Sequence, residues 1–371
     1  MSDFALDPAI IYLNHAAVAP WPQCTVEAVA EFARQNGIYG SQNYLQWLAK
    51  EEALRSLLAQ LINAPSKDDI ALLKSTSEGL SFVAYGLDWQ TGDNIVSIAQ
   101  EFPSNRIVWE SLLSRGVELR LLDLDVSNQP EQELLSLCDE RTRLISVSSI
   151  QYANGRKTNL NILGDYCRSK DILFVVDAIQ SLGASPFDVA QCKADIVVAD
   201  GHKWMLGPEG LALFYCRESI REQLKLNEYG WHMVEAMGDF DQKEWQLAKS
   251  ARRFECGSPN MLGVHALHTS LTLLLEQGLE SVSSKIQGLT QIIIDQVDAS
   301  GFQLVTPRTQ EMRGGIITFH VPDHDNQLLY QRLMEQRVMC AYRGGGVRFS
   351  PHFHNTEEQI LEAFTRLKSI L

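Results

Sequence analysis

Short apolar runs alternate with longer stretches in which apolar residues recur every three or four positions. Over about residues 17–260 the runs have the length typical of buried strands, and helical patterns such as 104–115 and 161–170 lie between most of them. This alternation predicts an α/β fold with a mainly parallel sheet covered by helices. The expected strands are Ile70–Leu73, Asn94–Ser97, Glu118–Leu122, Thr142–Ser148, Ile172–Val176, Ile196–Ala199 and Leu211–Tyr215.

The pattern changes after about residue 260. The later segments are two long helical stretches at 262–277 and 282–297, short alternating segments at 315–321 and 347–350, and an amphipathic helix over 356–371. Such a mixture predicts a smaller α+β domain. We expect the N-terminal tail to pack either on this domain or on a partner. We therefore expect a large domain over 17–260 and a small one over 1–16 and 261–371.

Composition narrows the classes of function. The net charge is −14 without any basic stripe, which argues against a nucleic-acid binder. No apolar stretch approaches the roughly 20 residues of a membrane span. The seven cysteines are odd in number and lack C-x-x-C spacing, so we expect reduced thiols in a cytoplasmic protein. His352-x-His354 lacks further ligands at suitable spacing, so no metal is expected.

Two ionisable residues follow neighbouring apolar runs, and ligands of open α/β sheets bind at the carboxyl ends of strands. Lys203 lies in D-G-H-K-W between an expected strand and an aromatic residue, where partial desolvation would lower its pKa and favour the neutral amine that forms Schiff bases. A surface lysine is the alternative. Asp177 ends another apolar run, where a buried carboxylate needs a cationic partner such as a protonated pyridine nitrogen. A helix N-cap is its alternative.

Other polar residues follow the remaining strands. Ser75 and Glu78 are spaced as a capping box, so a helix begins there, and its amides with the hydroxyls of Thr76 and Ser77 could bind a phosphate. A plain helix start explains the same residues. Phe102 could stack on a flat ring or belong to the core, and Asn154 could contact a ring substituent or form a turn.

Seven motifs in one order carry a family resemblance. They are S-T-S-E-G, E-F-P-S-N, Asn154, V-D-A-I-Q, D-G-H-K-W, R-R-F-E-C-G-S-P-N and G-G-G-V-R-F-S. From Tyr12 to Arg348 the chain resembles the class V aminotransferase family of fold-type I pyridoxal 5′-phosphate (PLP) enzymes. This family includes cysteine desulfurases, selenocysteine lyases, cystine C–S lyases, kynureninase and isopenicillin N epimerase. The resemblance implies a mainly parallel seven-stranded sheet and a homodimer with its site between subunits.

The resemblance also implies roles for individual residues. Lys203 would bind PLP as a Schiff base, and Asp177 would pair with the pyridinium nitrogen. The other cofactor contacts would be Gln180 at the phenolic oxygen, Phe102 on the ring, Thr76, Ser77 and His202 at the phosphate, and Ser258 reaching the phosphate from a second subunit. Arg348 would bind the substrate carboxylate, and Asn154 would lie near the ring or the substrate.

Three departures from the family pattern bear on the reaction. Phe102 stands where desulfurases usually carry a histidine. Asp200 stands where many relatives have a phosphate-binding serine, and we expect its carboxylate to point away from the phosphate. The segment Arg343–Arg348 is short and lacks the persulfide-forming cysteine of desulfurases, while Cys340 lies on the wrong side of the turn.

The absent loop cysteine ranks the possible reactions. We expect an enzyme that acts at the α-carbon of an amino acid, as an aminotransferase or a β-eliminating C–S lyase. A cysteine desulfurase or selenocysteine lyase, and an amino-acid epimerase, are the alternatives within the family. A catalytically idle PLP-binding relative is disfavoured because Lys203 and Asp177 are both present. A nicotinamide dehydrogenase is disfavoured because no strand is followed by G-x-G-x-x-G.

Overall fold

The structure is a computed structural model that describes residues 3–371. Its centre is a seven-stranded sheet in the order β2-β8-β7-β6-β5-β3-β4. The strands are β2 (Ile70–Leu73), β3 (Asn94–Ile98), β4 (Glu118–Leu122), β5 (Thr142–Ser148), β6 (Leu173–Asp177), β7 (Ile196–Asp200) and β8 (Ala212–Cys216). All run parallel except β8, which pairs antiparallel with both neighbours.

Each predicted strand is present, with ends shifted by a residue or less. Strands β2, β3, β5, β6, β7 and β8 are almost wholly buried, as expected for a parallel sheet covered on both faces. Strand β4, at the edge, is instead mostly exposed or half-buried, and only its last residue, Leu122, is buried. The fold is therefore the predicted α/β layer fold with a mainly parallel seven-stranded sheet.

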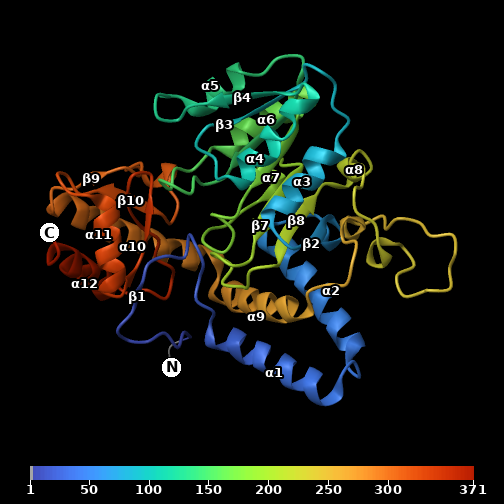
Figure 1. Cartoon of the computed structure of the whole chain (residues 1–371), viewed down its shortest axis with the longest axis horizontal. Coiled ribbons are helices and arrows are strands. Elements are labelled where there is room, and N and C mark those ends of the chain that lie inside the picture. Colours follow the sequence, from blue (N-terminus) through green and yellow to red (C-terminus); the bar gives the residue numbers. More distant parts are fainter. Residues whose placement is uncertain (1–2) are drawn as a thin grey trace.

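Helices cover the sheet and extend around it (Figure 1). Those before residue 260 are α1 (Gln23–Tyr39), α2 (Tyr44–Leu61), α3 (Thr76–Gly86), α4 (Ser104–Glu110), α5 (Pro130–Ser136), α6 (Leu160–Lys170), α7 (Val189–Cys192) and α8 (Glu218–Arg221). The short 3-10 helices are η1 (Lys67–Asp69), η2 (Leu113–Arg115), η3 (Trp231–Met233), η4 (Ala251–Phe254) and η5 (Gln310–Met312). The helix expected over 104–115 is thus divided into α4 and η2.

The C-terminal third builds a second layer around a small sheet. Its helices are α9 (Met261–Gln277), α10 (Leu279–Ala299), α11 (Asn326–Glu335) and α12 (Glu357–Lys368). The antiparallel sheet has the order β12 (Ala341–Arg343), β13 (Gly346–Phe349), β10 (Ile317–His320) and β9 (Gln303–Leu304). Figure 1 shows α10, α11 and α12 gathered with this sheet at one side of the molecule.

The N-terminal tail joins this C-terminal layer. Strand β1 (Ile11–Tyr12) pairs in parallel with β11 (Val338–Met339), and Ile11 and Leu13 belong to the apolar core of α10, α11 and α12. Helix α9 instead packs with the core beside the large sheet through residues such as Leu267 and Leu271. The division of the chain into domains of 17–260 and 1–16 plus 261–371 stays a prediction. No helix among residues 3–371 combines the length and the apolar character that crossing a bilayer demands.

Candidate active site

The carboxyl ends of the parallel strands bring the predicted residues to one edge of the large sheet. Asp177 is the last residue of β6 and Asp200 the last of β7, and the two strands pair with Asp177 opposite Val198. Lys203 follows β7 by three residues, and α3 begins at Thr76 after β2. This is the edge at which α/β sheets bind ligands.

Lys203 and Asp177 are buried ionisable groups that act on each other electrostatically. Their exposed fractions are 7% and 2%. Burial lowers the pKa of the Lys203 amine, an effect that Asp177 opposes and Arg348 adds to. Burial likewise raises the pKa of the Asp177 carboxyl, although an N–H from Ile179 donates to Oδ1 at 3.0 Å. The site therefore holds a lysine whose pKa is lowered and a carboxyl whose pKa is raised, both mainly because burial disfavours the charged form.

Phe102 lies on the same side of the sheet as the lysine. The Lys203 Nζ atom is 5.4 Å from the centre of the Phe102 ring. That ring meets Tyr152 edge-to-face with centroids 5.1 Å apart, and 38% of the Phe102 residue is exposed. A half-open aromatic surface next to the amine is thus available to a flat ligand.

Gln180 is fixed by two partners. One N–H of its side-chain amide donates to Ala16 O at 3.1 Å, and its Oε1 accepts the indole N–H of Trp204 at 2.8 Å. An amide nitrogen carries two hydrogens, so Gln180 has a second donor for a ligand. The contact to Trp204 also ties Gln180 to the residue next to Lys203.

The start of α3 differs from the expected capping box. Ser75 Oγ accepts the Glu78 N–H at 3.2 Å as predicted, but the Glu78 carboxylate accepts the N–H of Lys74 at 2.6 Å, not that of Ser75. Ser77 is exposed, and its hydroxyl donates to Ser104 Oγ at 2.9 Å. Ser77 therefore lies at the open end of the helix.

Asp200 does not point away from the predicted phosphate cradle, so that expectation was wrong. Its Oδ2 accepts the backbone N–H of Thr76 at 3.0 Å, and its own N–H donates to Thr76 Oγ1 at 3.2 Å. A first-turn amide of a helix attracts a nearby anion, and the Thr76 amide has the Asp200 carboxylate as its acceptor. His202 lies alongside, with Nδ1 at 4.0 Å from Asp200 Oδ1.

His202 and Arg348 each keep a buried nitrogen without a hydrogen-bond partner. These atoms are His202 Nδ1 and Arg348 Nε. Burial and Lys203 lower the pKa of His202 to about 4, so its imidazole is neutral at physiological pH. Arg348, on β13, is 2% exposed and donates from Nη1 to Tyr152 O at 2.6 Å. A buried polar atom without a partner points to a ligand that would supply one.

Asn154 and Ser258 lie less centrally. Asn154 Oδ1 accepts the Arg156 N–H at 3.0 Å, as in the turn that was its alternative interpretation. Ser258 is exposed and lines a hollow of about 260 Å³ together with Lys74 and Glu78 near the start of α3. Its hydroxyl is thus open to solvent or to another subunit.

Cys340 is a poor candidate for a reactive thiol. It is 1% exposed, and burial raises its pKa to about 12. The turn that follows is tight because Gly344 and Gly345 both adopt positive φ, 55° and 73°. A thiol held neutral in the core neither attacks nor carries sulfur at neutral pH.

Glu101 is a residue that the sequence pattern did not single out. It is 3% exposed and accepts hydrogen bonds from the Ser148 N–H at 2.7 Å, Gln151 Nε2 at 2.9 Å and Asn105 Nδ2 at 3.2 Å. It therefore joins the ends of β3 and β5 beneath the site. Its position directly before Phe102, at the end of a strand, was the one available signal.

His352 and His354 contact different partners. His352 Nε2 contacts Trp204 O at 3.1 Å, and His354 Nε2 contacts His15 Nε2 at 2.9 Å. His15 and His352 pack beside Trp204, with their own ring centres 5.2 Å apart. They contact Trp204, the residue that follows Lys203 in the chain.

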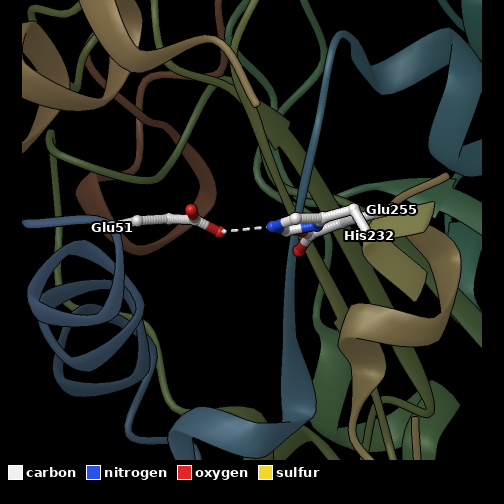
Figure 2. A group of neighbouring side chains, drawn as sticks. All are labelled: Glu51, His232 and Glu255. Carbon is white, nitrogen blue, oxygen red and sulfur yellow. Dashed lines mark ion pairs between the residues drawn. The ribbon is translucent and has the colours of Figure 1, made fainter. Parts of the chain in front are cut away.

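A separate buried group consists of Glu51, His232 and Glu255, and Figure 2 shows the Glu51 carboxylate pointing at the imidazole of His232, which overlaps Glu255 in this view. His232 Nε2 is 3.7 Å from Glu51 Oε1, and its Nδ1 is 3.3 Å from Glu255 Oε2. Within residues 3–371 it is the one set of three side chains spaced to hold a metal ion. Arg55 already forms ion pairs with both carboxylates, so we interpret the set as an ion-pair network.

Comparison with known proteins agrees with this geometry. The family model for aminotransferase class-V matches residues 11–362. A probable cysteine desulfurase of Pyrococcus abyssi is 28% identical, over 96% of this chain and 93% of its own length. The uncharacterized aminotransferase YcbU of Bacillus subtilis is also 28% identical, over 89% and 86% of the two chains.

Solved structures share the fold. The apo cysteine desulfurase of Thermococcus onnurineus superposes with a TM-score of 0.90 at 24% identity, covering 99% of this chain and 96% of its own. The cystine C–S lyase C-DES, solved with cysteine persulfide, gives a TM-score of 0.87 at 22% identity, covering 96% and 97%. Because the family model spans nearly the whole chain, this protein belongs to the class V aminotransferase family of PLP-dependent enzymes.

Proposed function

We propose that this enzyme acts at the α-carbon of an amino acid, as a β-eliminating C–S lyase or an aminotransferase. The observation that carries the proposal is the combination of Lys203, a buried lysine whose pKa is lowered, with the buried guanidinium of Arg348, which acts on it electrostatically. The amine of Lys203 suits proton transfer, and the guanidinium of Arg348 suits the binding of a carboxylate. An α-amino acid presents both an α-proton and a carboxylate.

The site residues suit PLP in their donor and acceptor types. Lys203 would hold it covalently through Nζ, Asp177 would face the ring nitrogen, and Gln180 would donate its second N–H to the phenolic oxygen. Support comes from the unpartnered His202 Nδ1 and the hydroxyl hydrogen of Thr76, both suited to the phosphate. When bound, PLP supplies an electron sink for charge that develops on the substrate α-carbon.

Substrate binding and proton transfer follow from the protein's own groups. Arg348 binds the substrate carboxylate through its planar fork, and the contact from Nη1 to Tyr152 O orients that fork beforehand. In its neutral form Lys203 accepts the α-proton at Nζ. A positioned general base of this kind contributes about 10²–10⁴-fold to rate. The neutral imidazole of His202 adds no second positive charge near Lys203.

The relatives' names favour a second candidate, a persulfide-forming cysteine desulfurase. That reaction moves sulfur to a protein thiol and leaves alanine. Cys340, the cysteine nearest in sequence to Arg348, is buried with a raised pKa, which supports elimination over persulfide transfer. Elimination from cysteine releases sulfide, pyruvate and ammonia and needs no protein thiol.

A substrate panel separates these outcomes. The purified holoenzyme is offered L-cysteine, L-cystine and L-alanine, and sulfide, pyruvate, alanine and protein persulfide are measured. Elimination gives pyruvate with sulfur release from cysteine or cystine, and transamination gives pyruvate from alanine with a change in cofactor absorbance. A persulfide lost in Cys340→Ala would overturn the ranking, and inertness toward all amino acids would overturn the proposal.

We propose that the active form is a homodimer in which Ser258 reaches the phosphate of the other subunit. Support comes from its exposed hydroxyl on the hollow that includes Lys74 and Glu78. Sedimentation should give a dimer, and Ser258→Ala should weaken PLP binding. A monomer with full cofactor occupancy would contradict this arrangement.

A further inference from the structure

Asp200 lies at the start of α3, the helix end to which the function proposed above assigns the PLP phosphate. Its carboxylate accepts the N–H of Thr76 at 3.0 Å, and Thr76 is the first residue of that helix. The reciprocal bond from the Asp200 N–H to Thr76 Oγ1 fixes the pair on both sides. Asp200 is 9% exposed, so water screens its charge poorly.

The groups that face Asp200 provide little spare positive charge. Lys203 is a cation that favours the ionised form of Asp200, while Glu78 of α3 opposes it, and Asp200 in turn raises the pKa of Asp177. His202 contributes a neutral ring whose Nδ1 lies 4.0 Å away without a hydrogen-bond partner. Once Lys203 is joined to the cofactor aldehyde, its full ammonium charge is no longer available to Asp200.

Two anions at one buried helix start repel each other. A phosphate group there carries between one and two negative charges at neutral pH. The repulsion between the phosphate and a neighbouring carboxylate favours the uptake of a proton by one of them. A protonated carboxyl offers one O–H donor and still keeps a carbonyl acceptor. The acceptor oxygen can therefore retain the Thr76 N–H while the O–H donates to the phosphate.

We propose, on the basis of the function proposed above, that Asp200 takes up a proton when the PLP phosphate binds at α3 and then acts as a hydrogen-bond donor to it. The proton comes from solvent and no covalent bond changes. Asp200 thus contacts the cofactor directly and makes the affinity of the protein for PLP depend on pH. With one proton bound per phosphate, the Kd for PLP rises about tenfold per pH unit in the range where free Asp200 is ionised.

The test is calorimetric titration of the apo-protein with PLP in buffers of different ionisation enthalpy, which counts the protons taken up. Asp200→Asn is the matched variant, because its amide oxygen can accept the Thr76 N–H and its NH₂ can donate to phosphate without titrating. We expect the wild type to take up about one proton more per subunit than Asp200→Asn. Pyridoxal, which lacks the phosphate, should give the same proton count in both proteins.

The possible outcomes are distinguishable. Equal proton uptake by the wild type and Asp200→Asn, with both binding PLP, would overturn the role of Asp200 and leave the proposed function intact. If the two proteins differed in proton uptake by the same amount with PLP and with pyridoxal, the role of Asp200 would also be overturned. The proton uptake would then not depend on the phosphate. If Asp200→Asn does not fold, Asp200→Ser replaces it under the same criteria. Failure of the wild type to bind PLP would contradict the proposed function itself.

Discussion

Arg348 Nη1 donates to the backbone oxygen of Tyr152 at 2.6 Å, which fixes the guanidinium between the small sheet and the end of β5. Its Nε atom is buried without a partner, and desolvation by burial lowers its pKa to about 10. An arginine held in this way is oriented for a carboxylate before the substrate arrives. The position of the side chain, more than its charge, should set substrate affinity.

Arg348→Lys should therefore weaken amino-acid binding while it keeps the charge. Loss of a charge-assisted hydrogen bond costs about 1.5–3 kcal/mol, so KM should rise roughly 10- to 100-fold, with a smaller change in kcat. The exposed Arg343, five residues earlier, provides the matched control Arg343→Lys. Equal effects of the two variants on KM would show that overall charge, and not the fork of Arg348, binds the substrate.

Gly79→Ala should destabilise the packing of α3 on the sheet. An added Cβ would lie 2.8 Å from Val198 Cγ1 and 3.0 Å from Phe214 Cδ2, which is closer than atoms pack. Such overpacking costs about 1–3 kcal/mol of unfolding free energy. Gly37→Ala in α1, where no atom lies within 4 Å, should instead stabilise by up to about 1 kcal/mol. Urea unfolding measures both, and a loss of stability in Gly37→Ala equal to that in Gly79→Ala would refute the steric explanation.

Arg55→Leu should be strongly destabilising. Arg55 pairs with Glu255 through Nη2 at 2.8 Å and also with Glu51, and all three side chains are at most 5% exposed. Removing the arginine leaves buried carboxylates without a full counter-charge, which costs about 3–5 kcal/mol. Arg34→Leu, which breaks an exposed pair with Glu31, should cost within about 1 kcal/mol. Similar unfolding free energies for the two variants would contradict the assigned network.

Stability should fall as the pH is lowered from about 6.5 toward 4. Burial lowers the pKa of His352 to about 3 and that of His354 to about 4, and His15 is shifted in the same direction. Unfolded histidines bind protons near pH 6.5, so the unfolded state then gains about 1.4 kcal/mol per pH unit for each such group. The stabilising contribution of these neutral histidines is complete above pH 6.5 and is lost on acidification.

Urea unfolding at pH 7.5 and pH 5.5 measures this dependence. His354→Asn should reduce the difference in unfolding free energy between the two pH values by about the contribution of one histidine. The matched control is His324→Asn at an exposed position. A wild type that is equally stable at both pH values would show that these imidazoles are protonated in the folded protein.

The sequence was sufficient to predict the strands and the order of the polar residues that follow them. Apolar runs with sharp polar ends mark buried parallel strands, so Asp177 and Lys203 could be placed at one edge of the sheet. The contact between Asp200 and Thr76 could not be predicted, because it depends on how α3 is placed beside the end of β7. Glu51, His232 and Glu255 escaped prediction for a related reason, since they are far apart in the chain and form no motif.

The most direct test of the account is to locate the lysine that holds the cofactor. The holoenzyme is reduced with borohydride and digested, and the peptides are analysed by mass spectrometry, with Lys203→Ala as the control. We predict that reduction bleaches the visible band and leaves the pyridoxyl phosphate mass on Lys203 alone. A modification on another lysine, or an unchanged peptide around Lys203 from protein that carries PLP, would contradict the central claim.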